Sequence, residues 1–186
     1  MTLESGMRLM GHNLRGDRQK DDYYATPSHV TDALLSVESF KGDIFEPCCG
    51  EGHISKRLME CGYTVESSDL VDRGYGVPGR DFLFEREKRD NIITNPPYAK
   101  MSLLMAEHAQ TIARHKTALL LKITFLEGVA RHEFFQRHPP TRVWVFSRRM
   151  SLLKDGQSYK GGSGMMCLAW FVWETGSTKL PQIGWI

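Results

Sequence analysis

The chain has 186 residues, of which 41% are hydrophobic and 25% are charged, and its formal net charge is +2 at pH 7. This length fits a single domain with its own core, and the composition is ordinary for a soluble globular protein. No apolar run approaches the roughly 20 residues of a membrane-spanning helix, so we expect no contact with membranes. The N-terminus lacks the apolar stretch of a secretory signal, which predicts a cytoplasmic protein.

The charges are unevenly distributed along the chain. Residues 1–98 contain 12 basic and 17 acidic side chains, whereas residues 99–186 contain 12 basic and 5 acidic ones. A basic C-terminal half favours an anionic partner, although a net charge of +2 does not by itself indicate nucleic acid.

The cysteines and histidines predict no metal site. The four cysteines are Cys48, Cys49, Cys61 and Cys167. They form no Cys-x-x-Cys pair, and neither they nor the seven histidines have the spacing of zinc ligands. We therefore expect buried, reduced thiols and no bound metal.

Strands and helices are predicted to alternate after a polar N-terminal segment. Strands are expected at 42–46, 63–67, 91–94, 117–123, 142–147 and 165–173. Helices are expected from the Ser28 cap onward and at 53–61, 101–115 and 128–137.

This alternation predicts an α/β fold of the doubly wound, Rossmann-like kind. We expect a seven-stranded, mostly parallel sheet with an antiparallel last strand and helices on both faces. The strands at 142–147 and 165–173 have no helix between them, so they should pair antiparallel as a hairpin. Residues 1–20 are predicted to be a mobile arm, 21–176 a single domain, and 177–186 a tail for which no element is expected.

The first strand runs into the glycine-containing turn Glu46-Pro47-Cys48-Cys49-Gly50-Glu51-Gly52. Gly50 and Gly52 would let the backbone approach a ligand closely. The turn lacks the spacing of a dinucleotide-binding loop, and Glu46 suits a cationic aminoacyl group better than a phosphate. A plain strand–turn–helix connection remains an equally good interpretation of this segment alone.

The motif Asn95-Pro96-Pro97-Tyr98 follows the third strand and is more specific. Consecutive prolines fix the backbone, so that the Asn95 side-chain oxygen and the Pro96 carbonyl can each accept an N–H of an exocyclic amine. Two such acceptors favour the nucleophilic form of that nitrogen, and Tyr98 offers a flat face on which a base can stack. The alternative is a Pro-Pro turn that merely closes a strand.

In this order, Asp22-Tyr23-Tyr24-Ala25-Thr26-Pro27, the Glu46–Gly52 turn and Asn95-Pro96-Pro97-Tyr98 resemble the motifs of the adenine-N6 DNA methyltransferases. These enzymes are class I Rossmann-like methyltransferases that bind S-adenosylmethionine (SAM). The segments 121–128, 139–143 and 169–173 are similar to those of small phage-type members, so the resemblance covers about 21–173. Cys48 departs from the pattern, because the usual loop begins with glycine there. No segment is long enough for a separate target-recognition domain.

The resemblance implies SAM as the cofactor and assigns its site. The implied SAM-binding residues are Tyr24, Thr26, Pro27, Glu46, Pro47, Cys48, Cys49, Gly50, Gly52, Asp69, Asp81 and Phe82. Asp69 matches the acidic residue that grips the ribose, with Glu66 as a possible substitute. Asp81 would accept from the adenine amine of the donor while Phe82 stacks on its ring. Asn95, Pro96, Pro97 and Tyr98 match the catalytic motif.

The expected partner is DNA, with RNA as an alternative. The segment between the last two predicted strands is basic and ends in the glycines 161–164. We expect it to contact nucleic acid through Arg148, Arg149, Lys154 and Lys160. An ordinary solvated hairpin loop is the competing interpretation, and the N-terminal residues Arg15, Arg18 and Lys20 are the next candidates.

The predicted activity is methyl transfer from SAM to N6 of adenine in DNA. RNA adenine or a protein glutamine amide poses the same chemical problem, since each presents a nitrogen whose lone pair is delocalised. A further alternative, from a different class, is an inert protein of this fold that binds nucleic acid without catalysis.

Overall fold

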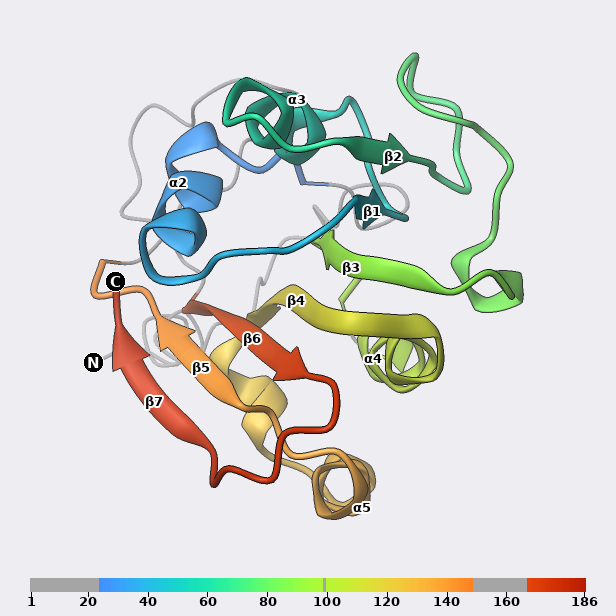
Figure 1. Cartoon of the computed structure of the whole chain (residues 1–186). Coiled ribbons are helices and arrows are strands. Elements are labelled where there is room, and N and C mark those ends of the chain that lie inside the picture. Colours follow the sequence, from blue (N-terminus) through green and yellow to red (C-terminus); the bar gives the residue numbers. More distant parts are fainter. Residues whose placement is uncertain (1–23, 99, 149–166) are drawn as a thin grey trace, which may run out of the picture.

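The computed structural model describes residues 24–98, 100–148 and 167–186 (Figure 1). The expected N-terminal arm and the basic residues Arg149, Lys154 and Lys160 lie outside the described residues. The helices are α2 (Ser28–Val37), α3 (His53–Glu60), η2 (Phe82–Phe84), α4 (Lys100–Ile112), η3 (Ile123–Leu126) and α5 (Val129–Arg137). The strands are β1 (Ile44–Glu46), β2 (Val65–Ser67), β3 (Arg89–Thr94), β4 (Ala113–Lys122), β5 (Arg142–Val145), β6 (Leu168–Glu174) and β7 (Gln182–Trp185).

The strands form one seven-stranded sheet in the order β2-β1-β3-β4-β6-β5-β7. All neighbouring pairs are parallel except those of β6, which runs antiparallel to both β4 and β5. The predicted fold class is therefore confirmed, as is the antiparallel pairing of the strands that no helix separates. The antiparallel strand is the sixth in the chain, however, and the last strand is parallel.

The seventh strand was not located by the sequence. We predicted no element in 177–186, yet β7 pairs with β5 at the edge of the sheet. A four-residue segment has too little periodicity to indicate a strand, so only its partner defines it. Gly184 fits this place because a Cβ there would lie 2.2 Å from a ring atom of Trp144.

Two predicted boundaries were also wrong. Ser28 is the first residue of α2 rather than its cap, and Pro27 holds the cap position without a side-chain hydrogen bond. Strand β4 begins at Ala113, directly after α4, and not at Thr117. The early residues of β4 alternate too little in polarity to reveal a strand, since Arg114 and His115 are both exposed.

Apolar side chains alternate between the two faces of the sheet. Helices cover both faces (Figure 1). Ile93, Leu120 and Trp170 point to the face that α2 and α3 cover. Their neighbours Ile92, Leu119 and Phe171 lie in the clusters on the other face, with α4 and α5. Strands buried on both faces are expected of a mostly parallel sheet, and they hold the carboxyl ends of β1 and β3 rigidly in place.

A buried ionic cluster ties α2 to the amino ends of the sheet strands. Glu38, the residue after α2, is 6% exposed. Its carboxylate accepts from Lys116 Nζ at 2.8 Å, from Arg142 Nη2 at 3.0 Å and from Trp144 Nε1 at 2.9 Å. Burial alone would raise the pKa of Glu38, but the hydrogen bonds from Arg142, Lys116 and Trp144 outweigh it and lower the pKa.

Within the described residues, no helix is long and apolar enough to cross a membrane. The same part of the chain holds no group of three or more side chains arranged to bind a metal ion.

Candidate functional site

A cleft opens at the carboxyl ends of β1, β2 and β3. From β1 the chain passes to β2 on one side and then to β3 on the other, which makes this the point where the strand order reverses. Ligands of doubly wound sheets bind at such points. The empty space of the cleft is about 930 Å³, which includes the part open to solvent.

Most of the residues predicted from sequence to bind SAM or catalyse transfer line this cleft. They are Tyr24, Thr26, Glu46, Pro47, Cys48, Cys49, Asp69, Asp81, Phe82, Asn95 and Pro97. They come from widely separated parts of the chain, and the fold brings them together.

The predicted residues Pro27, Gly50, Gly52, Pro96 and Tyr98 do not line the cleft. The Gly50 N–H donates to Asp69 Oδ2 at 2.8 Å, so this glycine orients a cleft residue. Gly52 precedes α3 with φ of 80°, and a Cβ there would lie 2.3 Å from the ring of Tyr75. The two glycines therefore shape the turn.

Glu46 is a buried carboxylate at the end of β1, with 1% of its surface exposed. Its Oε2 accepts from the Ser55 backbone N–H at 2.8 Å and from the Ser55 hydroxyl. Burial raises the pKa of Glu46 to about 8, and the negative charge of Asp69 adds to the effect. In the described part of the chain Glu46 has no cationic partner, so a cation in the cleft would stabilise its charged form.

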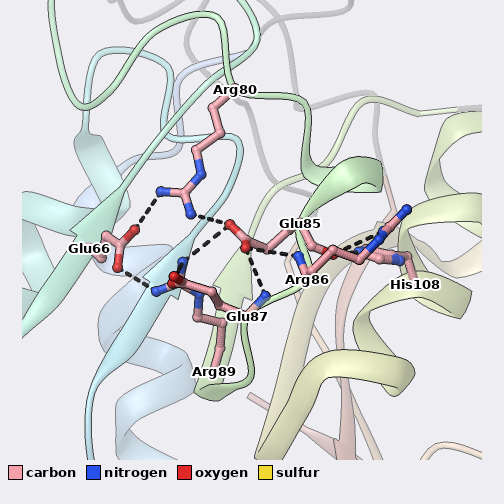
Figure 2. A network of polar contacts seen from close by, with 7 residues as sticks. All are labelled: Glu66, Arg80, Glu85, Arg86, Glu87, Arg89 and His108. Atoms are coloured by element: carbon pink, nitrogen blue, oxygen red, sulfur yellow. Dashed lines mark hydrogen bonds and ion pairs between the residues drawn. The ribbon is translucent and has the colours of Figure 1, made fainter.

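Asp69 lies just beyond β2 and is held by the backbone on both sides. Its Oδ2 accepts from Gly50 and its Oδ1 accepts from the Val71 N–H at 2.9 Å. Glu66, which the sequence left as an alternative for the same role, does not line the cleft. It pairs instead with Arg80 Nη1 at 2.6 Å and with Arg89 Nη1 at 2.5 Å (Figure 2).

Figure 2 shows that Arg80 bridges Glu66 and Glu85, while Arg89 joins the same two carboxylates. Burial alone would raise the pKa of Glu85, but hydrogen bonds from the Glu87 N–H, Arg89 and the Arg86 N–H lower it to about 2. The network spans both ends of the segment 80–85. The network therefore fixes the position of Asp81 and Phe82.

Asp81 and Phe82 begin the short helix η2 at one wall of the cleft. Asp81 caps this helix, since its Oδ1 accepts from the Leu83 N–H at 2.9 Å. Phe82 is buried, with its ring centroid 6.2 Å from that of Phe45 and 5.0 Å from that of His108. This corner of the cleft combines a carboxylate with an aromatic ring, a pairing that suits a flat heterocycle bearing an amine.

The side-chain amide of Asn95 is fixed in one orientation. Its Nδ2 donates to the carbonyl of Tyr24 at 3.3 Å and to Thr26 Oγ1 at 3.1 Å. Its Oδ1 is buried and has no hydrogen-bond partner in the described part of the chain. An acceptor left in this state is unfavourable unless a ligand supplies a donor.

The ring of Tyr98 is less accessible than the sequence led us to expect. It is 7% exposed, and the ring centroid of Tyr24 lies 6.1 Å away at an interplanar angle of 36°. The ammonium of Lys122 lies 5.0 Å from the Tyr98 centroid. An open stacking face was expected, but these neighbours cover the ring because β4 ends beside the turn that follows β3.

Cys48 stands in the cleft where the resembling enzymes have glycine. It is half-buried, its sulfur lies 3.9 Å from that of Met105, and burial raises the pKa of its thiol well above the ordinary value. A neutral thiol is a poor nucleophile, so Cys48 does not compete for an electrophile. The four cysteines are free, but Cys61 and Cys167 are exposed, so the expectation of buried thiols was wrong for those two.

The sequence missed several cleft residues, namely Ala25, His53, Ile54, Leu70, Val71, Arg73, Arg80, Leu83, Met101 and Met105. Two of them carried a usable signal. Met101 and Met105 are four apart at the start of α4 and thus share one face of that helix. The others depend on how the loops fold over the sheet.

Comparison with known proteins defines the fold. The chain has the fold of the class I SAM-dependent methyltransferases. A modification subunit of a proposed type I restriction enzyme from Vibrio vulnificus aligns with a TM-score of 0.62 and 11% identity, over 98% of this chain and 50% of that one. A proposed RNA methyltransferase from Pyrococcus horikoshii gives 0.61 and 13%, over 94% and 99%.

A proposed class I SAM-dependent methyltransferase from Listeria monocytogenes aligns with a TM-score of 0.59 and 14% identity, over 96% of this chain and 69% of that one. No protein-family model and no curated protein sequence matches the chain. Identities this low establish a common fold only. The activity has to be argued from the site.

Proposed function

We propose that this protein is a SAM-dependent methyltransferase that modifies N6 of adenine in DNA. The observation that carries the proposal is the state of Asn95. Its amide nitrogen is held by Tyr24 and Thr26, while its buried Oδ1 has no partner in the described residues. Because Asn95 lines the cleft, an adenine N6–H bound there would satisfy this acceptor.

The cleft fits SAM at three points. Glu46 is a buried carboxylate with no described cationic partner, and it suits the cationic aminoacyl end of the donor. Asp69, at the end of β2, would hold the ribose hydroxyls. Asp81 and Phe82 would hold the adenine ring. Of the other residues predicted to bind the donor, Thr26 would pack on its methionine end, and Pro47, Cys48 and Cys49 would lie beneath it. Pro27, Gly50 and Gly52 would support these residues from outside the cleft.

The proposed chemistry is a direct displacement. When bound, SAM supplies an electrophilic methyl group, whose bond to sulfur breaks with both electrons staying on sulfur as the adenine N6 lone pair forms the new C–N bond. Asn95 Oδ1 and the Pro96 carbonyl would accept the two N6–H groups and favour the nucleophilic form of the nitrogen. The proton that N6 then loses would pass to water.

A nucleic-acid substrate is supported by the position of Arg148. It is exposed and follows β5, at the same rim of the sheet as Asn95. We propose that Arg148, Arg149, Lys154 and Lys160 contact phosphates. Replacing Arg149 or Lys160 by alanine should reduce the salt-dependence slope of DNA binding by about one unit each, without changing SAM binding.

RNA remains the alternative polymer. The Pyrococcus horikoshii protein, a proposed RNA methyltransferase, has nearly all of its length covered by this chain. We propose one catalytic domain over 21–176, and a domain of this size leaves little room for reading a long recognition sequence. Flipped or single-stranded adenine presents the same edge in both polymers.

The decisive experiment measures transfer of a labelled methyl group from SAM to DNA, RNA and total protein, followed by nucleoside analysis. N6-methyladenine in DNA is the expected product, and Asn95→Ala should lose it while still binding SAM. Transfer to protein alone would replace the proposal with glutamine methylation. SAM binding without transfer to any of the three would indicate an inert protein of this fold.

A further inference from the structure

Lys122 lies beside Tyr98, the last residue of the proposed catalytic motif. It is the last residue of β4, and its ammonium lies 5.0 Å from the ring centroid of Tyr98. The Lys122 side chain is exposed, whereas Tyr98 is 7% exposed. Among the described residues, no carboxylate forms an ion pair with Lys122. Within that part of the chain, no ion pair neutralises its charge.

The sheet places Lys122 at the centre of the rim where a substrate must approach. Strands β3 and β4 are parallel neighbours with Thr94 opposite Leu119, so both end at this rim. On its other side Lys122 is paired with Leu168, the first residue of β6, and Arg148 follows the next strand. Along the rim, Lys122 thus lies between the end of β3, which Tyr98 follows, and the end of β5, which Arg148 follows.

We propose that Lys122 binds the phosphate adjacent to the target adenine, and that in doing so it leaves the ring of Tyr98. This inference rests on the proposed function, because it requires a nucleic-acid substrate. As the site stands, a base cannot stack on Tyr98 without displacing a neighbour. An exposed lysine on a flexible stem is the neighbour that moves most easily.

Exchanging the Tyr98 ring for a phosphate as the partner of Lys122 is favourable with a nucleic acid. A neutral substrate offers no such exchange. A solvent-exposed ammonium gains little from contact with a ring, whereas its charge-assisted hydrogen bond to a phosphate is stronger. Phosphate binding would therefore draw the ammonium away and uncover the part of the Tyr98 ring that Lys122 covers, while Tyr24 stays in place. A glutamine side chain carries no phosphate, so Lys122 would lose its contact with the Tyr98 ring without gaining a new one.

The test uses a short single-stranded DNA with one adenine, in which each phosphate in turn is replaced by an uncharged methylphosphonate. With the wild-type protein, kcat/KM should fall about tenfold when the phosphate that Lys122 contacts is neutralised. Lys122→Met should lose about tenfold with the unmodified strand and become insensitive to that one replacement. Its salt-dependence slope should be smaller by about 0.7.

Two further variants separate phosphate binding from a structural role. Lys122→Arg should retain most activity and the sensitivity to the same methylphosphonate. Lys179→Met removes an exposed lysine that precedes β7, at the opposite end of the sheet, and should behave as wild type. SAM binding should be unchanged in all three variants, which also verifies that they fold.

The outcomes distinguish this inference from the proposed function. If the wild-type protein methylates DNA but Lys122→Met keeps full activity or the same methylphosphonate profile, Lys122 does not bind the phosphate. If the wild-type protein methylates neither DNA nor RNA, the proposed function and this inference fall together.

Discussion

Glu38 and Glu46 are two buried glutamates at opposite ends of the same sheet, and their surroundings differ sharply. Glu38 is 6% exposed and shares its carboxylate with Lys116, Arg142 and Trp144. Glu46 is 1% exposed, and its described partners are the two polar groups of Ser55. The pKa of Glu38 is lowered, whereas that of Glu46 is raised to about 8.

The carboxylate of Glu38 stabilises the fold, whereas that of Glu46 is placed to bind a ligand. Burying a charge is unfavourable, and the chain compensates it fully at the amino ends of the strands. At the carboxyl ends of the strands, no described cation compensates the buried carboxylate of Glu46, which lies beside an open cleft. Strongly perturbed groups in clefts are typical of functional sites.

The largest expected effect concerns the ionic cluster around Glu38, at the amino ends of the strands. Glu38→Gln should reduce the free energy of unfolding by about 3–5 kcal/mol, because it leaves Lys116 and Arg142 without their buried counter-charge. Urea denaturation would measure this. Glu87→Gln, which neutralises an exposed member of another ion pair, is the control and should change stability little. Equal changes in stability in the two variants would contradict the structural role of Glu38.

Substituting Asn95 tests the proposed ligand-binding cleft at the carboxyl ends of the strands. Asn95→Ala should reduce methyl transfer by about a hundredfold or more while keeping SAM affinity within a few-fold, because its oxygen acts on the acceptor in the transition state. Single-turnover kinetics and calorimetry would measure the two quantities. Asn91→Ala is a matched control on the same strand, since Asn91 Nδ2 donates to the Lys41 and Asp43 carbonyls away from the cleft. Near wild-type turnover in Asn95→Ala would refute the mechanism.

Asp69 and Asp81 extend the comparison to the rest of the cleft. Asp69→Ala and Asp81→Ala should each weaken SAM binding by roughly 1–3 kcal/mol, the value of hydrogen bonds to a charged group. Asp72→Ala, in the same loop but exposed, should leave the affinity unchanged. Calorimetry that finds wild-type affinity in both cleft variants would mean that the donor binds elsewhere.

Glu46 and Glu85 should also respond oppositely to pH. Glu46 has a pKa of about 8 when folded and an ordinary value of 4.5, so between these values the folded state holds a proton that the unfolded state has lost. Its contribution to stability is therefore present below about pH 4.5 and is lost as the pH rises towards 8, by up to about 1.4 kcal/mol per pH unit.

Glu46→Gln should abolish this slope, as measured by urea denaturation across that range, and should weaken SAM binding. Glu85 provides the contrast. Its folded pKa of about 2 lies below the ordinary value of 4.5, so its contribution is lost only as the pH falls through that lower window. A slope that persists in Glu46→Gln between pH 4.5 and 8 would show that another group causes it.

The smallest expected effect concerns access of the base to the cleft. Adenine N6 inside a duplex is hydrogen-bonded, and extruding the base costs a few kcal/mol. Mispaired or single-stranded adenine should thus be methylated at least as readily as paired adenine. Initial rates on matched oligonucleotides would measure this, and a strict requirement for one perfect duplex site would contradict it.

The sequence by itself determined the order of the strands up to β6 and most members of the candidate site. Glycines, prolines and alternating apolar residues report local conformation, which is why the strand ends at Glu46 and Asn95 were predictable. It also placed Asp81 and Phe82 together, because neighbours along the chain cannot be far apart. Their joint presence in one cleft with Asp69 follows from a doubly wound sheet.

Only the tertiary structure decided the features that depend on partners distant along the chain. Strand β7 exists because β5 pairs with it, and Glu66 is excluded from the cleft because Arg80 and Arg89 hold it. The same holds for the contact of Lys122 with Tyr98 and for the opposite pKa shifts of Glu38 and Glu46. Burial and charge compensation are set by long-range packing, and a residue's identity does not reveal which neighbours it will have.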